Sequence, residues 1–165
     1  MAKQTFKVGD TVVYPAQGAG TVEELTKREV LGETRDYLRL SFVRGEMDVL
    51  VPLNKTTEVG LRHTFKLEDI DKLVTTLLAG EMKLPPQWPP RHRFELDVLS
   101  RAEAFELASM IGTLTKRDLE KGLADTEREI MERAKNMLAS ELAVVQKLTL
   151  DKAKQRINEE LEHIT

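Results

Sequence analysis

The spacing of apolar residues changes near residue 63, from a period of about two to a period of about 3.6, and this change restricts the possible folds. Between residues 6 and 59 apolar and polar residues alternate, as they do along the run YLRLSF at Tyr37–Phe42. Such alternation is typical of half-buried β-strands, and residues 12–14 and 47–51 are further strand candidates. From residue 67 onward apolar residues recur every three or four positions, which is typical of amphipathic helices. The sequence therefore predicts an α+β protein in which the strands come first.

Glycine-bearing turns divide the N-terminal part of the chain into short strands. They are LGET at Leu31–Thr34 and VRGE at Val43–Glu46, and each lies between candidate strands that can pair as a hairpin. The GAG at Gly18–Gly20 resembles the start of a dinucleotide-binding loop, but Glu23 replaces the last glycine of that fingerprint. A hairpin turn is the better interpretation of GAG. Short antiparallel strands over about 50 residues predict a small β barrel, SH3-like or Tudor-like.

Apolar residues at helical spacing predict a compact all-α C-terminal domain. Gly80 follows the first set and predicts a helix end at that position. Ser100 and Glu103 have the spacing of a capping box, so we expect a helix to begin after Ser100. Thr126 and Glu129 repeat that spacing and predict the start of another helix. The apolar sets are Leu67, Ile70, Leu73 and Leu77, then Ala102, Phe105, Ala108 and Ile111, then Ile130, Ala134, Met137, Leu138 and Leu142, and finally Ala153, Ile157, Leu161 and Ile164.

The change of period also predicts a domain boundary. It lies within the segment LNKTTEVGLRHTF at Leu53–Phe65, and we place it after Arg62. The first domain then comprises residues 1–62 and the second residues 63–165. Both lie within the size range of small domains, which extends from about 50 to about 200 residues.

The composition gives little support to a metal centre or an active site. The chain has no cysteine, and His63, His92 and His163 lie far apart in the sequence without i, i+4 partners, so we expect no metal site. The serines lack the context of a nucleophile elbow, and acidic residues alternate with basic ones as on solvated helix faces. We therefore expect no catalytic residue, no cofactor and no enzymatic activity.

Charge and hydropathy argue against strong binding to nucleic acid or membranes by the protein alone. The chain has 25 Lys and Arg residues against 28 Asp and Glu residues, and no third of it is basic. Because non-specific affinity increases with the number of phosphates neutralised, we expect weak binding to DNA or RNA unless a second attachment contributes. No apolar run reaches the roughly 18 residues of a membrane span, and MAKQTFKVGD has no apolar signal segment, so we expect a cytoplasmic protein.

Trp88, the only tryptophan, lies between two proline pairs in the segment LPPQWPPRH at Leu84–His92. Proline fixes φ and lacks an N–H donor, so a stiff extended segment should end here at the start of a helix. The start of a helix attracts phosphate and disfavours cations, so Arg91 and Arg93 are better explained if an anion binds nearby. Two interpretations of Trp88 remain open: an anchor in the core or between domains, and a rigid aromatic side chain that contacts a nucleic-acid base.

Four segments occur in an order that is informative as a set. They are FKVGDTVVYPAQGAGTV at Phe6–Val22, VPLNKTTEVGLR at Val51–Arg62, the proline-framed Trp88, and KRDLEKGLADTERE at Lys116–Glu129. In this order they resemble the CarD/CdnL family of bacterial transcription regulators, and the first part is also similar to the polymerase-interacting module of transcription-repair coupling factors. The resemblance implies a Tudor-like N-terminal domain that binds the β subunit of RNA polymerase. It also implies a helical C-terminal domain at promoter DNA, at the upstream edge of the transcription bubble, in a protein associated with the nucleoid through RNA polymerase.

The resemblance assigns roles to individual residues. It implies that Trp88 wedges into the minor groove at the upstream fork and that Arg91 and Arg93 contact the nearby DNA backbone. Arg128, early in the helix predicted after Thr126, would add a further phosphate contact. Arg28 occupies a position at which the family has a basic residue facing RNA polymerase.

The chain departs from the family pattern at two positions. Leu50 stands where some relatives have an arginine at the polymerase interface, and Pro90 stands where some have another basic residue. By alternation Leu50 shares a strand face with Asp48, away from Val49 and Val51. We therefore expect an exposed edge strand that binds RNA polymerase partly by main-chain pairing, with Leu50 as an apolar contact beside Asp48. An ordinary surface role for Leu50 also remains open.

A tether to RNA polymerase would explain how a protein with little affinity for DNA can act on it. Binding to the polymerase would raise the local concentration of the C-terminal domain to the order of 1 mM at the edge of the bubble. We therefore expect a monomer that recognises the location of the fork with little sequence specificity. The alternative from another class is a scaffold or adaptor that binds only proteins and buries Trp88 between its domains.

Overall fold

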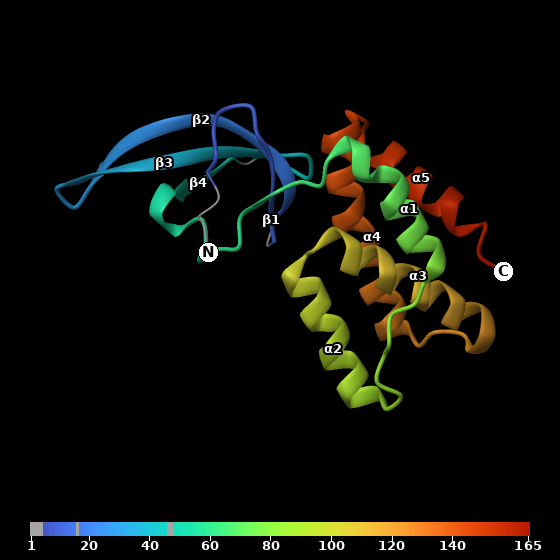
Figure 1. Cartoon of the computed structure of the whole chain (residues 1–165). Coiled ribbons are helices and arrows are strands. Elements are labelled where there is room, and N and C mark those ends of the chain that lie inside the picture. The colour runs from blue at the N-terminus through green and yellow to red at the C-terminus, as the bar shows by residue number, and fades with distance from the viewer. Residues whose placement is uncertain (1–4, 16, 46–47) are drawn as a thin grey trace.

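A β domain of five strands precedes a domain of five α-helices in the computed structural model, which describes residues 5–15, 17–45 and 48–165 (Figure 1). The sheet has the order β4-β3-β2-β1-β5, and the paired strands are all antiparallel. The predicted architecture, a small Tudor-like antiparallel β domain followed by an all-α domain, is confirmed. The strands are β1 (Thr11–Tyr14), β2 (Gly18–Val30), β3 (Glu33–Phe42), β4 (Val49–Pro52) and β5 (Arg62–His63). The helices are α1 (Ile70–Ala79), α2 (Trp88–Arg101), α3 (Ala104–Lys121), α4 (Asp125–Gln146) and α5 (Leu150–Leu161), with short 3₁₀ turns at Leu53–Lys55 and Leu67–Asp69.

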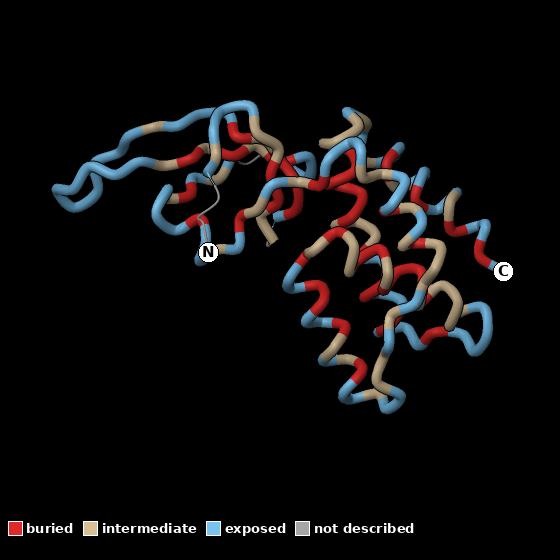
Figure 2. Tube along the Cα trace, viewed as in Figure 1, coloured by how far each residue is buried: buried red, intermediate tan, exposed pale blue. Residues whose placement is uncertain are grey.

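Alternation along β3 separates a buried face of the sheet from an exposed one, as the sequence predicts. Leu38, Leu40 and Phe42 are buried, and they pack with Val22 and Val51 in the core of the β domain. The residues between them face solvent (Figure 2). Met47 and the last residue of the turn predicted at Val43–Glu46 lie outside the described residues.

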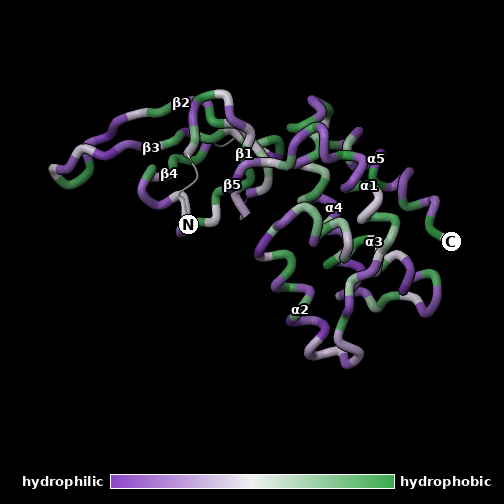
Figure 3. Tube along the Cα trace, viewed as in Figure 1, coloured by the Kyte–Doolittle hydropathy of each residue, from purple (hydrophilic) through white to green (hydrophobic). Residues whose placement is uncertain are grey.

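The β2–β3 hairpin extends beyond the rest of the sheet as a two-stranded ribbon (Figure 1). β4 pairs with β3 only as far as Tyr37, so the ribbon lacks a third strand along residues 27–30 and 33–36. Leu31 and Gly32 both have positive φ, 53° and 79°, as a two-residue type I′ turn requires. The turn predicted in LGET is therefore confirmed. Figure 3 shows a hydrophilic ribbon with a hydrophobic turn, where Leu31 is fully exposed.

Close packing of α1 against α3 organises the helical domain. Gly80 ends α1 in the left-handed conformation, with φ 51°, as the sequence predicts. Gly112 in the middle of α3 lies against the end of α1, where an added Cβ atom would be 1.9 Å from the carbonyl oxygen of Leu77. Only glycine permits this approach. The remaining helices enclose one continuous apolar core around α3, with Leu107, Ile111 and Leu114 fully buried.

Two predicted helix starts were wrong. α2 continues through Ser100 to Arg101, and α3 begins after Glu103, whose carboxylate accepts hydrogen bonds from the backbone N–H groups of the first turn. Ala102 turns the chain between the two helices with φ 52°. α4 begins at Asp125 after Ala124, so Thr126 lies inside the helix and does not cap it. An acidic side chain can cap a helix as a hydroxyl can, and the predictions considered only hydroxyl caps.

Buried polar contacts and a small apolar cluster join the two domains. The Arg62 guanidinium donates hydrogen bonds of 2.8 and 2.9 Å to the two carboxylate oxygens of Glu141, which is 1% exposed. The N–H of Ala19 donates to the hydroxyl of Ser140 at 3.1 Å, and Val13 and Ala19 pack on Ala102. β5 pairs with β1 through Arg62 and His63, and the division after Arg62 stays a prediction. None of the helices in the described part of the chain is long and apolar enough to cross a membrane.

Candidate functional site

Trp88 lies at the end of the helical domain that is remote from the sheet. It is the first residue of α2, after the extended Gln87, and Pro89 and Pro90 occupy the first turn. α2 has 14 residues and is therefore about 20 Å long. Its other end meets the β domain through Ala102 (Figure 1). Trp88 is half-buried and does not lie between the domains. The scaffold alternative, which requires Trp88 to be buried between the domains, does not fit this position.

Side chains of α2 hold the ring of Trp88 in place. The His92 ring stacks on it with 4.9 Å between centroids and 21° between planes. The Arg91 guanidinium carbon lies 5.1 Å from the Trp88 ring centroid, within the range of a cation–π contact. Arg91 also donates a hydrogen bond of 2.9 Å to the carbonyl oxygen of Pro86. The same arginine therefore fixes both the tryptophan ring and the proline segment that precedes it.

Arg91 is buried and paired with carboxylates of the protein. Its Nε atom donates to Glu127 Oε2 at 2.8 Å and lies 3.8 Å from Glu95 Oε2. Arg117 reaches the other oxygen of Glu127 at 3.6 Å. Because Arg91 is 7% exposed and its guanidinium faces this cluster, the geometry favours a role in positioning Trp88. A direct contact between Arg91 and the DNA backbone stays a prediction.

Glu95 completes this cluster and is fully buried. Neither of its carboxylate oxygens accepts a hydrogen bond from the described residues. Burial and the neighbouring Glu127 carboxylate raise the pKa of Glu95 to about 8, against the opposing effect of Arg91 and Arg117. The raised pKa favours the protonated, neutral form of Glu95 in this cluster. The i, i+4 spacing of Arg91 and Glu95 was a sequence signal for part of the cluster, but Glu127 is 36 residues from Arg91.

The Arg91–Glu127 pair brings the start of α4 against the start of α2, so Arg93 and Arg128 belong to the same end of the domain as Trp88. Arg93 is exposed and forms no ion pair with a described residue. Arg128 pairs with Asp118 at 3.1 Å while its side chain remains 49% exposed. At this end of the domain Arg93 is therefore accessible, and Arg128 is accessible in part.

The candidate polymerase contacts share the exposed face of the sheet. Arg28 lies opposite Arg35 in the ribbon, and Leu50 lies opposite Arg39 on the same face. Arg39 bonds the Asp48 carboxylate at 2.6 Å, so Asp48 belongs to this face as well. The sheet order makes β4 an edge strand, as predicted, and Leu50 is 37% exposed on it. We call this surface, which carries Arg28, Arg35, Arg39, Asp48 and Leu50, the outer face.

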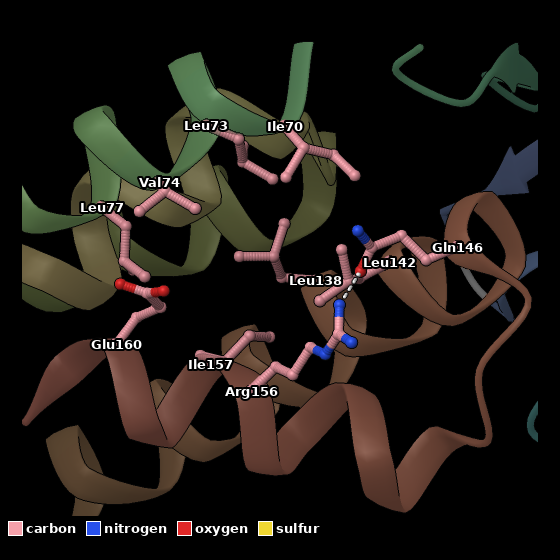
Figure 4. Close-up of a pocket in the computed structure, with 10 residues that line it drawn as sticks. All are labelled: Ile70, Leu73, Val74, Leu77, Leu138, Leu142, Gln146, Arg156, Ile157 and Glu160. Atoms are coloured by element: carbon pink, nitrogen blue, oxygen red, sulfur yellow. Dashed lines mark hydrogen bonds between the residues drawn. The ribbon is translucent and has the colours of Figure 1, made fainter. Parts of the chain in front are cut away.

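An apolar pocket with a volume of about 110 Å³ lies between α1, α4 and α5 (Figure 4). Arg156 and Glu160 are its charged lining residues, and Arg156 donates a hydrogen bond of 3.0 Å to Gln146. Gln146 also lines the pocket, and its remaining side chains are aliphatic, Leu73 and Leu77 among them. Titratable groups do not converge here, and the described residues contain no cluster of His, Asp and Glu suited to a metal ion.

Comparisons with known proteins cover both domains. Residues 6–63 match the CarD-like/TRCF RID domain, and residues 72–158 match the CarD C-terminal domain. The chain belongs to the CarD family. The resemblance predicted from the four sequence segments is thereby confirmed. A similar protein of Bacillus subtilis (strain 168), named "Putative transcription factor YdeB", is 27% identical over 144 residues, which is 87% of this chain and 94% of that protein.

The CarD match follows the architecture closely. Its N-terminal part ends at His63, the last residue of β5, and its C-terminal part begins inside α1. Trp88 and the buried Arg91 cluster belong to the second matched segment, and the outer face belongs to the first.

Proposed function

We propose that this CarD-family transcription regulator binds the β subunit of RNA polymerase through the outer face and stabilises the open promoter complex with Trp88. Family membership supports transcription regulation and an interaction with RNA polymerase in general. The observation that carries the finer proposal is the placement of a rigidly held, half-exposed tryptophan at the end of the molecule remote from the outer face. One protein can then contact the polymerase and the DNA at the same time.

The outer face suits a protein partner. The edge strand β4 offers unpaired main-chain groups to a strand of the polymerase, and Leu50 offers an apolar side chain beside them. Arg39 bonds both Glu24 and Asp48, which holds these side chains in place and leaves the group of three with one excess negative charge. Arg28 on the projecting ribbon adds a cation for an acidic group of the partner.

Trp88 suits insertion at the fork of the bubble. Proline at both sides and the contacts with His92 and Arg91 limit the entropy that the side chain would lose on binding. Stacking of an aromatic ring on a base contributes about 1 to 3 kcal/mol. A contribution of about 1.4 kcal/mol changes an equilibrium tenfold, so one such contact is enough to regulate promoter opening.

The chain has a net charge of −3, so the tether to the polymerase is part of the proposed mechanism. Binding through the outer face would hold Trp88, Arg93 and Arg128 near the upstream edge of the bubble at an effective concentration on the order of 1 mM. Selectivity would arise from the position of the bubble, because a tryptophan ring that inserts at a base step does not read the base sequence through a pattern of hydrogen bonds.

Site-specific photocrosslinking tests this arrangement. With p-benzoylphenylalanine at position 88, we expect crosslinks to promoter DNA at the upstream edge of the bubble. At position 50 we expect crosslinks to the β subunit. The same group at Asn158, exposed on α5, serves as the control and should crosslink to neither. Crosslinks from position 88 only to polymerase subunits would contradict the proposal.

A further inference from the structure

We propose that a cleft at the junction of the two domains binds a backbone phosphate of the duplex upstream of Trp88, through Arg44 and Arg133. This inference rests on the proposed function and adds a second DNA-binding site to it. We call the site the junction cleft. Its volume is about 290 Å³. Its polar lining side chains are Gln17 and Arg44 from the β domain and Ser100, Arg133 and Asn136 from the helical domain.

The charge of the junction cleft is suited to an anion. Among the residues that the structure describes, none that lines the cleft is acidic. Arg44 and Arg133 are exposed and form no ion pair within the described parts of the chain. In a chain of net charge −3, most other arginines are neutralised by a carboxylate of the protein. These paired arginines are Arg35, Arg39, Arg62, Arg91, Arg101, Arg117 and Arg128.

The two domains hold the walls of the junction cleft in a fixed relation. Arg44 follows β3, and Arg133 projects from α4. The nearby hydrogen bond from Ala19 to Ser140 and the apolar contact of Ala19 with Ala102 fix these elements against each other. The elements that carry the two guanidinium groups are therefore already in place, which lowers the entropic cost of bringing both groups to one anion. A phosphate oxygen is the best partner for such a pair, because arginine matches it in charge and geometry.

α2 connects the junction cleft to Trp88 and sets the distance between them. Leu96 and Ser100 line the cleft, eight to twelve residues after Trp88, which corresponds to about 12 to 18 Å along the helix axis. Base pairs of B-DNA are spaced by about 3.4 Å, so this length spans about four or five base pairs. A duplex that runs along α2 from the fork would pass the exposed Arg93 and then present its backbone to the cleft.

A double variant, Arg44→Gln with Arg133→Gln, tests the proposal in the complex with RNA polymerase and promoter DNA. The control is a second double variant, Arg156→Gln with Lys154→Gln on α5, which removes the same number of positive charges away from the cleft. Open-complex lifetimes are compared on a promoter with its full upstream duplex and on one truncated two base pairs upstream of the bubble.

On the full duplex we expect the open-complex lifetime with the double variant to be about fivefold shorter, or more, than with the unmodified protein. The slope of log lifetime against log salt concentration should decrease by the amount expected for the loss of about two phosphate contacts. On the truncated promoter we expect the double variant to give the same lifetime as the unmodified protein. The control pair should give the same lifetime as the unmodified protein on both templates. An unchanged lifetime on the full duplex, together with a loss caused by Trp88→Ala, would overturn the junction cleft and leave the proposed function standing.

Two further results would overturn the inference in distinguishable ways. If the unmodified protein does not lengthen the lifetime on either template, the proposed function and the junction cleft both fail. If inorganic phosphate raises the melting temperature of the unmodified protein but not of the double variant, while lifetimes on the full duplex are equal, the cleft binds a free anion and not DNA.

Discussion

The Nε atom of Arg91 lies 2.8 Å from Oε2 of Glu127, and this buried pair joins the start of α2 to the start of α4 beside Trp88. The pair links the sequence segment that holds the tryptophan to a helix 36 residues away. The rigidity of Trp88 therefore depends on tertiary packing as well as on the prolines around it.

Arg91→Met should destabilise the protein and loosen Trp88. It leaves Glu127 charged and buried with only Arg117 nearby, and loss of one partner from a buried pair costs about 3 to 5 kcal/mol. Urea denaturation measures the stability, and acrylamide quenching of the only tryptophan measures its accessibility, which should increase. The control is Arg101→Met, which breaks an exposed pair with Glu106 and should cost at most about 1 kcal/mol. Equal effects of the two variants would contradict the role of the buried pair.

Glu95 should make stability decrease as the pH rises. Its pKa is raised to about 8 in the folded protein from an ordinary value of 4.5, so between these values the folded state binds more protons than the unfolded state. The free energy of unfolding contributed by this group therefore falls from about pH 4.5 to about pH 8 and stays low above that.

Glu95→Gln, which imitates the protonated carboxyl, should remove this dependence and be more stable than the unmodified protein at pH 9 by about 1 kcal/mol or more. Urea denaturation at pH 6 and pH 9 measures both effects. Glu106→Gln, at an exposed carboxylate of α3, is the control and should leave the difference between the two pH values unchanged. If Glu95→Gln retains the full loss of stability at pH 9, Glu95 is not the titrating group.

Sequence patterns predicted the fold well where local physics decides the structure. Alternation in β3 and the left-handed Gly80 depend on side chains near in sequence, and both predictions were confirmed. The helix start after Ser100 was wrong because α2 continues to Arg101, and the turn at Ala102 leaves Glu103 as the cap. The pairing of Arg91 with Glu127 was beyond sequence patterns, because it depends on how α2 and α4 pack.

Gly112→Ala should be strongly destabilising. The added Cβ atom would lie 1.9 Å from the Leu77 carbonyl oxygen, a backbone atom that can move only if α1 and α3 separate. Overpacking of this kind costs about 3 kcal/mol or more when backbone must shift. Thermal unfolding followed by circular dichroism checks this. Ser109→Ala on the same helix is the matched control, and a Gly112→Ala variant as stable as that control would contradict the close packing of the two helices.

Leu50→Asp should weaken binding to RNA polymerase without unfolding the protein. Leu50 is 37% exposed on the edge strand. A second carboxylate beside Asp48 would be costly to desolvate against an apolar partner and would repel an acidic one. We expect at least about a tenfold loss of affinity for the isolated β-subunit lobe, measured by isothermal titration calorimetry. Leu67→Asp, at a leucine that is 64% exposed outside the outer face, should bind normally. Normal binding by Leu50→Asp would exclude β4 from the interface.

The most direct test of the central claim is the lifetime of open complexes on a ribosomal RNA promoter after challenge with a competitor. It is measured with RNA polymerase alone, with the unmodified protein and with Trp88→Ala. We expect the unmodified protein to lengthen the lifetime and Trp88→Ala to lose most of that effect. A lost contribution of about 1.4 kcal/mol would shorten the lifetime about tenfold relative to the unmodified protein. The variant should still fold and bind the polymerase. A lifetime with Trp88→Ala equal to that with the unmodified protein, at equal occupancy of the polymerase, would contradict a wedge at Trp88.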